Sequence, residues 1–433
     1  MLFFSAAIAD SGASKQVQVT PDQAISLIGQ GDAKTVAKLA RERSNSDPHS
    51  AVWHEVIALA HVHQQQFIEE VVQTSISESR RAAELAPRDA RVLATRSIIQ
   101  FLLKEYSDAI KSAKIAVQLQ PENRRAKMVL LASKMLEKLA NSKSSITSTW
   151  SKNDDGKEEV LRLCSAAGNE FDVYSVAIRY FRIRLDPDGV NKVFDMWLKN
   201  MPKSSYAYYR RGQFEEAQRD FVHALGYYEK ATALNARYVT PLARMAYCQY
   251  KLKRYEDALK TYKSLERVNG FSNSARYLHR AQCYAALGKY HMAVKDYNAA
   301  IEGELGSADS VKQLEEAKKR DPKTRKVLRS WLDMRAEAYE KLGNLESAVT
   351  DAKLGVMVSP GDPAALNFRR KLYERHNQLE LALKDLNFLV QLNPTAASWY
   401  EARAAVLERL GRKADAQNDL KRYDSLRKHG TLK

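Results

Sequence analysis

Cysteine, proline and glycine are scarce in this sequence of 433 residues, which contains 3, 11 and 17 of them. The three cysteines, Cys164, Cys248 and Cys283, are too few for a disulfide framework, so we expect buried free thiols. No stretch reaches the roughly 20 apolar residues of a membrane-spanning helix. A glycine-rich phosphate loop, a zinc-binding spacing and a nucleophile motif are also missing. The sequence therefore predicts no enzyme activity, no catalytic residue, no metal site and no cofactor.

Positive charge exceeds negative charge, with 69 Lys and Arg residues against 52 Asp and Glu residues and a formal net charge of +17. Such an excess favours acidic partners, which include nucleic acids, anionic lipid surfaces and acidic peptides. It is equally typical of a solvated outer face on an elongated helical protein. Composition alone leaves both interpretations open.

A period of 34 residues dominates the C-terminal half of the chain. Ala348, Ala382 and Ala416 follow it, as do Pro360 and Pro394, and Ala224, Ala258 and Ala293 recur at spacings of 34 and 35. Residues 275–302 carry the clearest unit, in which large apolar residues at helical spacing lead to Gly288 and a second helix starts near Tyr290. The small residues Ala281 and Ala293 would let the two helices approach closely. A helix pair repeated at this period predicts a solenoid.

This pattern resembles the tetratricopeptide repeat, strongly from Ser204 to the C-terminus and weakly from residue 20 onwards. The resemblance implies an all-α, right-handed superhelical solenoid of antiparallel helix pairs, with about ten or eleven repeats. We divide the chain into a tail or signal remnant (1–19), degenerate N-terminal repeats (20–141), a polar insertion (142–157), central repeats (158–302), a basic insertion (303–326) and C-terminal repeats with a polar capping helix (327–433). Within the basic insertion, residues 311–320 are expected to form a helix that ends at Asp321 and Pro322.

In this family the first helix of each repeat lines a concave groove that takes extended peptides or partner helices. Transferred by repeat position, the exposed groove residues are Tyr209, Arg210, Gln213, Arg244, Tyr247, Lys251, His279, Gln282, Asn367, Lys371 and Arg375. The set is polar, basic and partly aromatic, which suits an acidic peptide or a free carboxylate. The alternative is that these are only the solvated residues that any groove must have. The Lys, Asn and Arg arrangement of chaperone-tail adapters does not occur in three adjacent repeats, so that subgroup is not supported.

Four arginine and aspartate pairs recur at a separation of 16 residues and could be mistaken for a catalytic site. They are Arg280 with Asp296, Arg335 with Asp351, Arg369 with Asp385, and Arg403 with Asp419. Because one residue lies midway along a first helix and the other midway along the second, we predict structural ion pairs within each helix pair. Arg96 and Arg211 occupy the same position but lack the aspartate, so we expect them to be freer to bind a ligand. His61 and His63 lie on different faces of a helix, which predicts a surface or packing role.

We therefore predict a non-enzymatic scaffold that binds protein or peptide in its concave groove. The alternative is a protein that binds RNA or associates with RNA through its basic surface, although Asp333, Glu337 and Glu401 interrupt a continuous basic track. A cytoplasmic protein is expected. Residues 1–9 instead have features of a shortened export signal, which would indicate an exported or periplasmic protein.

Overall fold

The computed structural model describes residues 19–63, 69–141, 155–268, 274–305, 316–317 and 319–430. Within these ranges all regular secondary structure is helical, and 22 helices succeed one another as packed pairs. The prediction of an all-helical solenoid of antiparallel helix pairs is confirmed, while the hand of its superhelix stays a prediction. The chain forms two compact units, Met1–Arg244 (unit 1) and Met245–Lys433 (unit 2), which we describe separately.

Unit 1 contains the less regular repeats. Its helices are α2 (Pro21–Gly29), α3 (Ala33–Ser46), α4 (Ala51–His63), α5 (Glu69–Leu85), α6 (Ala90–Leu102), α7 (Tyr106–Leu119), α8 (Arg124–Asn141), α9 (Asp155–Ser165), α10 (Phe171–Ile183), α11 (Pro187–Asn200), α12 (Ser205–Ala217) and α13 (Phe221–Leu234). The start of helix α2 is determined by two residues. The Thr20 side chain caps the helix by accepting a hydrogen bond from the backbone of Gln23, and Pro21 occupies its first turn. Helix α14 (Val239–Lys251) crosses the division between the units.

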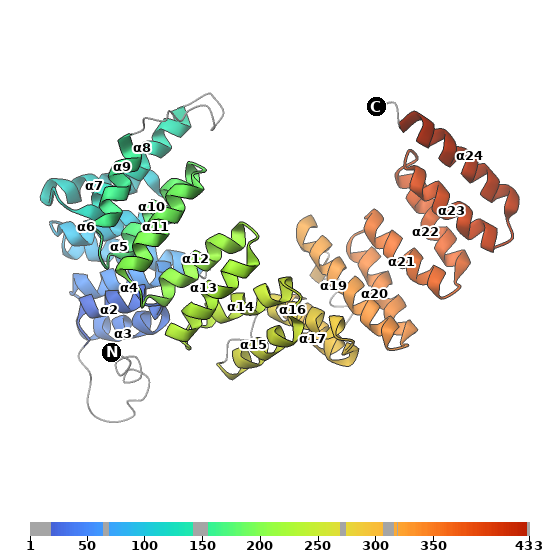
Figure 1. The fold of residues 1–433 in the computed structure, drawn as a ribbon, viewed down its shortest axis with the longest axis horizontal. Coiled ribbons are helices and arrows are strands. Elements are labelled where there is room, and N and C mark those ends of the chain that lie inside the picture. Colours follow the sequence, from blue (N-terminus) through green and yellow to red (C-terminus); the bar gives the residue numbers. More distant parts are fainter. Residues whose placement is uncertain are drawn as a thin grey trace. The chain divides into compact units, whose positions relative to one another are not determined.

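The stack of helices in unit 1 curves, so that α2, its first helix, contacts α12. Figure 1 shows the blue helices α2–α4 beside the green α12 and α13. The Ser204 hydroxyl donates a hydrogen bond to the Gly29 carbonyl, and the Ser205 hydroxyl donates to the Gln30 carbonyl at 2.6 Å. Asn235 donates to the Asp32 carboxylate at 2.9 Å. Unit 1 is therefore closed by contacts between its first and last helices.

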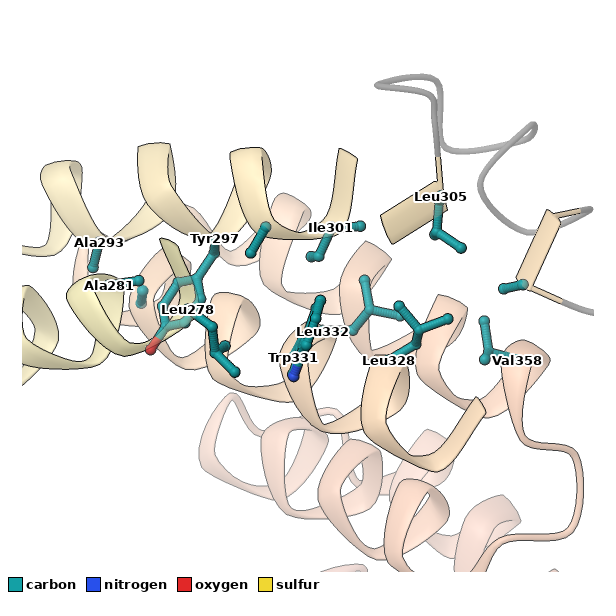
Figure 2. Close-up of a cluster of buried hydrophobic side chains, with 13 residues drawn as sticks. Leu278, Ala281, Ala293, Tyr297, Ile301, Leu305, Leu328, Trp331, Leu332 and Val358 are labelled. Atoms are coloured by element: carbon teal, nitrogen blue, oxygen red, sulfur yellow. The ribbon is translucent and has the colours of Figure 1, made fainter. Parts of the chain in front are cut away.

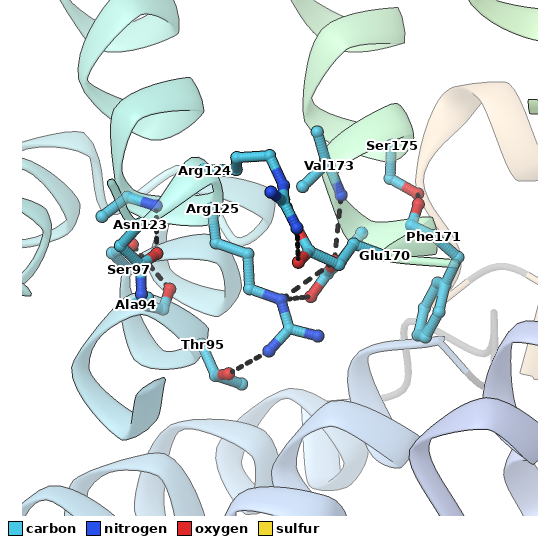
Figure 3. Close-up of polar contacts among 12 residues, drawn as sticks. Ala94, Thr95, Ser97, Asn123, Arg124, Arg125, Glu170, Phe171, Val173 and Ser175 are labelled. Carbon is cyan, nitrogen blue, oxygen red and sulfur yellow. Dashed lines mark hydrogen bonds and ion pairs between the residues drawn. The ribbon is translucent and has the colours of Figure 1, made fainter. Parts of the chain in front are cut away.

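A buried ionic network connects α4, α6, α8 and α10 inside unit 1, and Figure 3 shows its central part. The Arg125 guanidinium pairs with Asp172, with its Nε 3.0 Å from Asp172 Oδ2, and Glu55 acts on it through its charge. Glu55 itself pairs with Arg91, whose Nη2 lies 3.1 Å from its carboxylate. Thr95 joins both sides, because its hydroxyl donates to Glu55 at 2.7 Å and accepts from Arg125 at 3.3 Å. Burial raises the pKa of both carboxyl groups despite the neighbouring arginine charges.

Aromatic side chains fill the core around α10, α11 and α12. Trp197 is fully buried and stacks on Tyr174, with ring centroids 5.4 Å apart and planes inclined by 9°. It also stacks on Phe194 at 6.2 Å and meets the Tyr206 ring edge-on at 5.7 Å. This cluster holds α12 in place against α11 and α10.

Unit 2 carries the regular repeats, in helices α15 (Tyr255–Arg267), α16 (Ser274–Ala286), α17 (Tyr290–Leu305), α19 (Pro322–Lys341), α20 (Leu345–Val358), α21 (Pro363–Arg375), α22 (Leu379–Leu392), α23 (Ala397–Arg409) and α24 (Lys413–Gly430). Gly288, at φ 71°, supplies the left-handed turn between α16 and α17. Figure 2 shows the small Ala281 and Ala293 beside Tyr297 between these helices, and Trp331 and Leu332 of α19 extend the same cluster. Each repeat thus buries its apolar face against the next.

The two insertions are shorter than the sequence predicts. Asp155 opens α9, so the polar insertion ends before residue 155, and residues 142–154 lie outside the described residues. At the basic insertion, α17 continues to Leu305 and α19 starts at Pro322. The Asp321 carboxylate accepts from the backbone of Lys323 and Thr324 and caps α19, while the end of the helix predicted at 311–320 stays a prediction. Most of the helix predicted at 311–320, and the tail 1–18, also fall outside the described residues.

Within the described ranges, no helix combines the length and the apolar character needed to cross a membrane. Cys164, Cys248 and Cys283 are buried free thiols. Burial raises the pKa of Cys164 and of Cys283 to about 12, which leaves both thiols protonated and unreactive at neutral pH.

Candidate functional site

A cavity of about 580 Å³ lies on the inner side of unit 1, between its first helices. Its lining comes from α4, α6, α10 and α12, and consists of Val62, His63, Leu102, Ser175, Ile178, Arg179, Arg182, Ile183, Tyr206, Tyr209, Arg210 and Gln213. Three of these residues are arginines and none is a carboxylate. We call this cavity the unit 1 pocket.

Helical spacing explains which residues of α10 and α12 enter the lining. Ser175, Ile178, Arg179 and Arg182 follow one another at intervals of 3, 1 and 3 residues, and Tyr206, Tyr209, Arg210 and Gln213 repeat those intervals. Residues spaced in this way share one face of a helix. Each helix therefore presents one face with both polar and apolar side chains to the pocket.

The arginines of the unit 1 pocket have neutral hydrogen-bond partners. Arg179 donates to the Leu102 carbonyl at 2.8 Å and to the Tyr106 hydroxyl at 2.9 Å, while its guanidinium lies 5.4 Å from the centre of the Phe101 ring. Arg210 donates to the Tyr206 hydroxyl at 2.8 Å. Arg182 is exposed. These contacts fix the orientation of Arg179 and Arg210 without neutralising their charge.

His63 completes a chain of polar contacts in the wall of the pocket. Its Nδ1 lies 2.9 Å from the Tyr206 hydroxyl, which already accepts from Arg210. The Tyr206 hydroxyl can accept from Arg210 and donate its own hydrogen to Nδ1, an arrangement in which the His63 hydrogen lies on Nε2. His63 is 5% exposed, and its Nε2 has no hydrogen-bond partner among the described residues. Burial, followed by the positive charge of Arg210, lowers the pKa of His63 to about 3.

Unit 1 should lose stability on mild acidification because of His63. The unfolded chain takes up a proton at its ordinary pKa near 6.5, whereas the folded state stays neutral until about pH 3, so stability falls as the pH drops through that window. We expect His63 to account for about 2 kcal/mol of the stability lost between pH 7 and pH 5.

The measurement compares urea unfolding of the wild type and His63→Asn at pH 7 and pH 5. Asparagine retains an acceptor for the Tyr206 hydroxyl but does not titrate, so the variant should show a smaller loss between the two pH values. An equal loss in both proteins would show that His63 is protonated in the folded state.

The groove residues predicted in unit 1 have different environments. Arg210 and Gln213 line the pocket. The prediction that Tyr209 is exposed is wrong, since it is 2% exposed and packs against Tyr228 and Tyr238, with ring centroids 5.9 and 5.4 Å apart. Arg244 contacts Glu216, to which its Nε donates at 2.8 Å, so its charge is compensated.

Arg211 is not free, contrary to the sequence prediction. It lies 2.9 Å from Glu215, and its guanidinium sits 5.3 Å from the Phe194 ring and 5.5 Å from the Tyr227 ring. The aromatic residue at the usual aspartate position thus packs on the arginine instead of pairing with it. Arg96 lines a separate small cavity of about 100 Å³ together with Glu105 and Asp108.

Four predicted groove residues of unit 2 lie on α14 and α16, and two of them form an aromatic cluster. The Tyr247 and His279 rings are 4.9 Å apart, and Tyr250 stacks on His279 at 5.5 Å. Exposed Lys251 places its ammonium 5.3 Å from the Tyr247 ring. Gln282 is directed elsewhere, because its amide donates to the Met334 sulfur at 3.2 Å. The result is a partly exposed aromatic surface with one cation.

The predicted groove residues of α21 differ from one another in exposure and in hydrogen-bond partners. Lys371 is exposed. Asn367 accepts from Arg370 at 3.0 Å, and Arg375 forms two hydrogen bonds to Glu340, at 2.9 and 2.8 Å. Glu340 also contacts His376 at 2.8 Å. Of these three residues, only Lys371 extends an uncompensated charge into solvent.

The structure brings together all four arginine and aspartate pairs that the 16-residue spacing singles out. In each pair the arginine donates twice to the carboxylate, from Nε and Nη2, and Arg335 with Asp351 has the deepest burial, with distances of 2.8 and 2.7 Å. The other pairs are Arg280 with Asp296, Arg369 with Asp385, and Arg403 with Asp419. Such forked contacts tie the two helices of a repeat together.

Sequence analysis missed Arg179, Arg182 and Tyr206 as site residues and assigned His63 only a packing or surface role. Repeat position could not identify them, because α10 belongs to a degenerate repeat whose register the period does not fix. A usable signal was present in the matched spacing of Ser175 to Arg182 and Tyr206 to Gln213. The described residues contain no cluster of three or more His, Cys, Asp or Glu side chains able to hold a metal ion.

A comparison with known protein families matches the helix pair that has the clearest repeat pattern in the sequence. Residues 275–302, which span most of α16 and all but the end of α17, match the family described as tetratricopeptide repeat. Residues 275–302 therefore form a tetratricopeptide repeat. The predicted family is thereby confirmed on the segment with the clearest pattern. No curated protein matches the sequence.

Solved structures similar to this chain have low sequence identity to it. YrrB, a TPR protein with an unusual peptide-binding site, is 16% identical with a TM-score of 0.38, over 48% of this chain and 97% of its own. MamA 41-end from Desulfovibrio magneticus RS-1 is 17% identical with a TM-score of 0.33, over 43% and 96%. The APC/C hetero-tetramer Cut9–Hcn1 is 13% identical with a TM-score of 0.34, over 94% and 87%. We draw no functional conclusion from these similarities.

Proposed function

We propose that this chain is a non-enzymatic scaffold that binds segments of partner proteins on the inner faces of its first helices. The observation that carries the proposal is the unit 1 pocket, a cavity of about 580 Å³ lined by four first helices and combining apolar, aromatic and cationic side chains. Pockets of a few hundred cubic ångströms with a few fixed polar groups are typical of binding sites. The exposed Lys251 beside Tyr247 and the exposed Lys371 supply further polar contact points in unit 2.

Peptide recognition accounts for these features better than RNA recognition does. Single-stranded nucleic acid requires a continuous basic track with accessible aromatic platforms. Here Arg244 and Arg375 are compensated by Glu216 and Glu340. The remaining cations are separate anchors, which fits a peptide whose side chains enter individual sites.

The test is an affinity pull-down with the full chain from a source lysate, with and without nuclease. Lys251→Glu with Lys371→Glu reverses two predicted groove charges, and Lys263→Glu with Lys384→Glu reverses two exposed charges on second helices as a matched control. We expect protein partners that survive nuclease treatment and whose recovery falls several-fold in the groove variant alone. Recovery of RNA, with protein partners lost on nuclease treatment, would overturn the proposal in favour of RNA binding.

A further inference from the structure

The arginines of the unit 1 pocket differ from the other inward-facing arginines of the chain. Arg125, Arg280, Arg335, Arg369 and Arg403 each contact at least one carboxylate. Among the described residues, Arg179 and Arg210 donate to a carbonyl and to phenol hydroxyls, and no described carboxylate lines the pocket with them. A partly buried cation without a counter-charge is costly in a folded protein. The pocket therefore holds positive charge for which the described chain supplies no compensation.

The surrounding groups orient this charge instead of neutralising it. Arg210 donates to Tyr206, and Tyr206 in turn contacts His63, whose low pKa keeps it neutral beside the cation. Arg179 is fixed by the Leu102 carbonyl and the Tyr106 hydroxyl. Guanidinium groups held in a defined orientation match the geometry of a carboxylate, which accepts two parallel hydrogen bonds.

The other lining residues limit the chemical class of ligand that the unit 1 pocket can bind. Val62, Leu102, Ile178 and Ile183 give the pocket apolar walls, and Ser175 and Gln213 add neutral polar groups. A sugar–phosphate backbone would bring several charges and no apolar contact for these walls. An acidic residue next to an apolar one satisfies both kinds of lining.

We propose that the unit 1 pocket binds a carboxylate of a partner protein segment, with Arg179 and Arg210 as its oriented charged contacts, the exposed Arg182 as a further charge, and an apolar residue of the segment against Ile178 and Ile183. The proposal rests on the proposed function, since it specifies which chemical group the scaffold recognises. The carboxylate can belong to an aspartate or glutamate side chain or to the C-terminus of the partner.

The experiment selects ligands with the full chain from two pools of hexapeptides, one with a free C-terminal carboxylate and one amidated. Retained peptides are identified by mass spectrometry, and the affinity of the most enriched peptide is then measured by fluorescence anisotropy. Arg182→Gln removes an exposed charge and does not threaten folding, Arg210→Gln removes an oriented one, and Lys371→Gln in unit 2 is the control. Inorganic phosphate serves as a competitor that carries charge without apolar groups.

We expect peptides containing Asp or Glu to be enriched in both pools, or free-carboxylate peptides alone if the terminus is recognised. Each pocket variant should weaken binding about tenfold, whereas Lys371→Gln should leave it within about twofold. Selection of neutral or basic peptides, equal affinity in the pocket variants, or complete displacement by phosphate would overturn the carboxylate site and leave the scaffold function standing. Retention of no peptide at all would overturn both.

Discussion

Replacing Arg125 by methionine is expected to destabilise unit 1 by about 3–5 kcal/mol at neutral pH. The Arg125 side chain is 13% exposed and Asp172 is 0% exposed, so the variant leaves the Asp172 carboxylate buried without its cation. Glu55, which is 1% exposed, keeps its ion pair with Arg91 at 3.1 Å and loses only the more distant charge of Arg125. Removal of one partner of a buried ion pair is costly because the remaining charge stays desolvated. Urea unfolding measures the loss, and hydrogen exchange of α8 and α10 locates it.

Arg124→Met is the matched control for this prediction. Arg124 is the preceding residue, and it pairs with Glu170 at 2.8 Å, but its side chain is 40% exposed. A surface pair of this kind contributes about 0–1 kcal/mol. Similar losses in the two variants would show that burial of the Arg125 network adds no stability.

The cost of Arg125→Met should also depend on pH. Burial already raises the pKa of Asp172 and Glu55, and loss of the arginine would raise it further. A carboxyl group whose folded pKa exceeds its unfolded value opposes folding increasingly as the pH rises above the unfolded value. The difference between wild type and variant should therefore be larger at pH 7.5 than at pH 5.

Replacing Trp197 by alanine is expected to cost about 3–5 kcal/mol, because it opens a cavity in the aromatic core of unit 1. Trp197 is fully buried between Tyr174 and Phe194. Its edge contact with Tyr206 also connects this core to the pocket wall, so Trp197→Ala should weaken peptide binding as well. Urea unfolding followed by circular dichroism measures the stability, and anisotropy measures the binding.

The variant Trp197→Phe distinguishes the contribution of aromatic ring packing from the contribution of the indole group itself. The Trp197 Nε1 has no hydrogen-bond partner among the described residues, so phenylalanine removes a buried unsatisfied donor while keeping most of the ring contact. We expect a cost of about 1–2 kcal/mol for this variant. Equal costs for the alanine and phenylalanine variants would contradict the proposed role of the stacked rings.

The sequence predicts unit 2 well because its repeats share one register. The 16-residue separation of Arg335 and Asp351 places both on facing helices of one pair, and local geometry then brings them together. The same reasoning fails for Tyr209, whose repeat position indicates exposure. Tyr238, which directly precedes α14, covers it, and because this contact comes from the following repeat, the position within one repeat does not reveal it.

The contact between His63 and Tyr206 in the pocket wall was beyond sequence analysis for a different reason. His63 and Tyr206 are 143 residues apart, and no periodic pattern relates them. They meet because the first helices of unit 1 curve far enough to bring α4 to α12.

The hydrogen bonds from Ser204 and Ser205 to Gly29 and Gln30 join residues 175 positions apart, whereas the ion pairs of unit 2 join residues 16 apart. Contacts between distant residues slow folding, and contacts between near neighbours speed it. During synthesis, α2 can pack on α3 and α4 early, but the part of it that contacts α12 stays uncovered until α12 has left the ribosome. Unit 2 can instead add one helix pair at a time. Unit 1 is consequently the part of the nascent chain with the longest exposure to aggregation and chaperones.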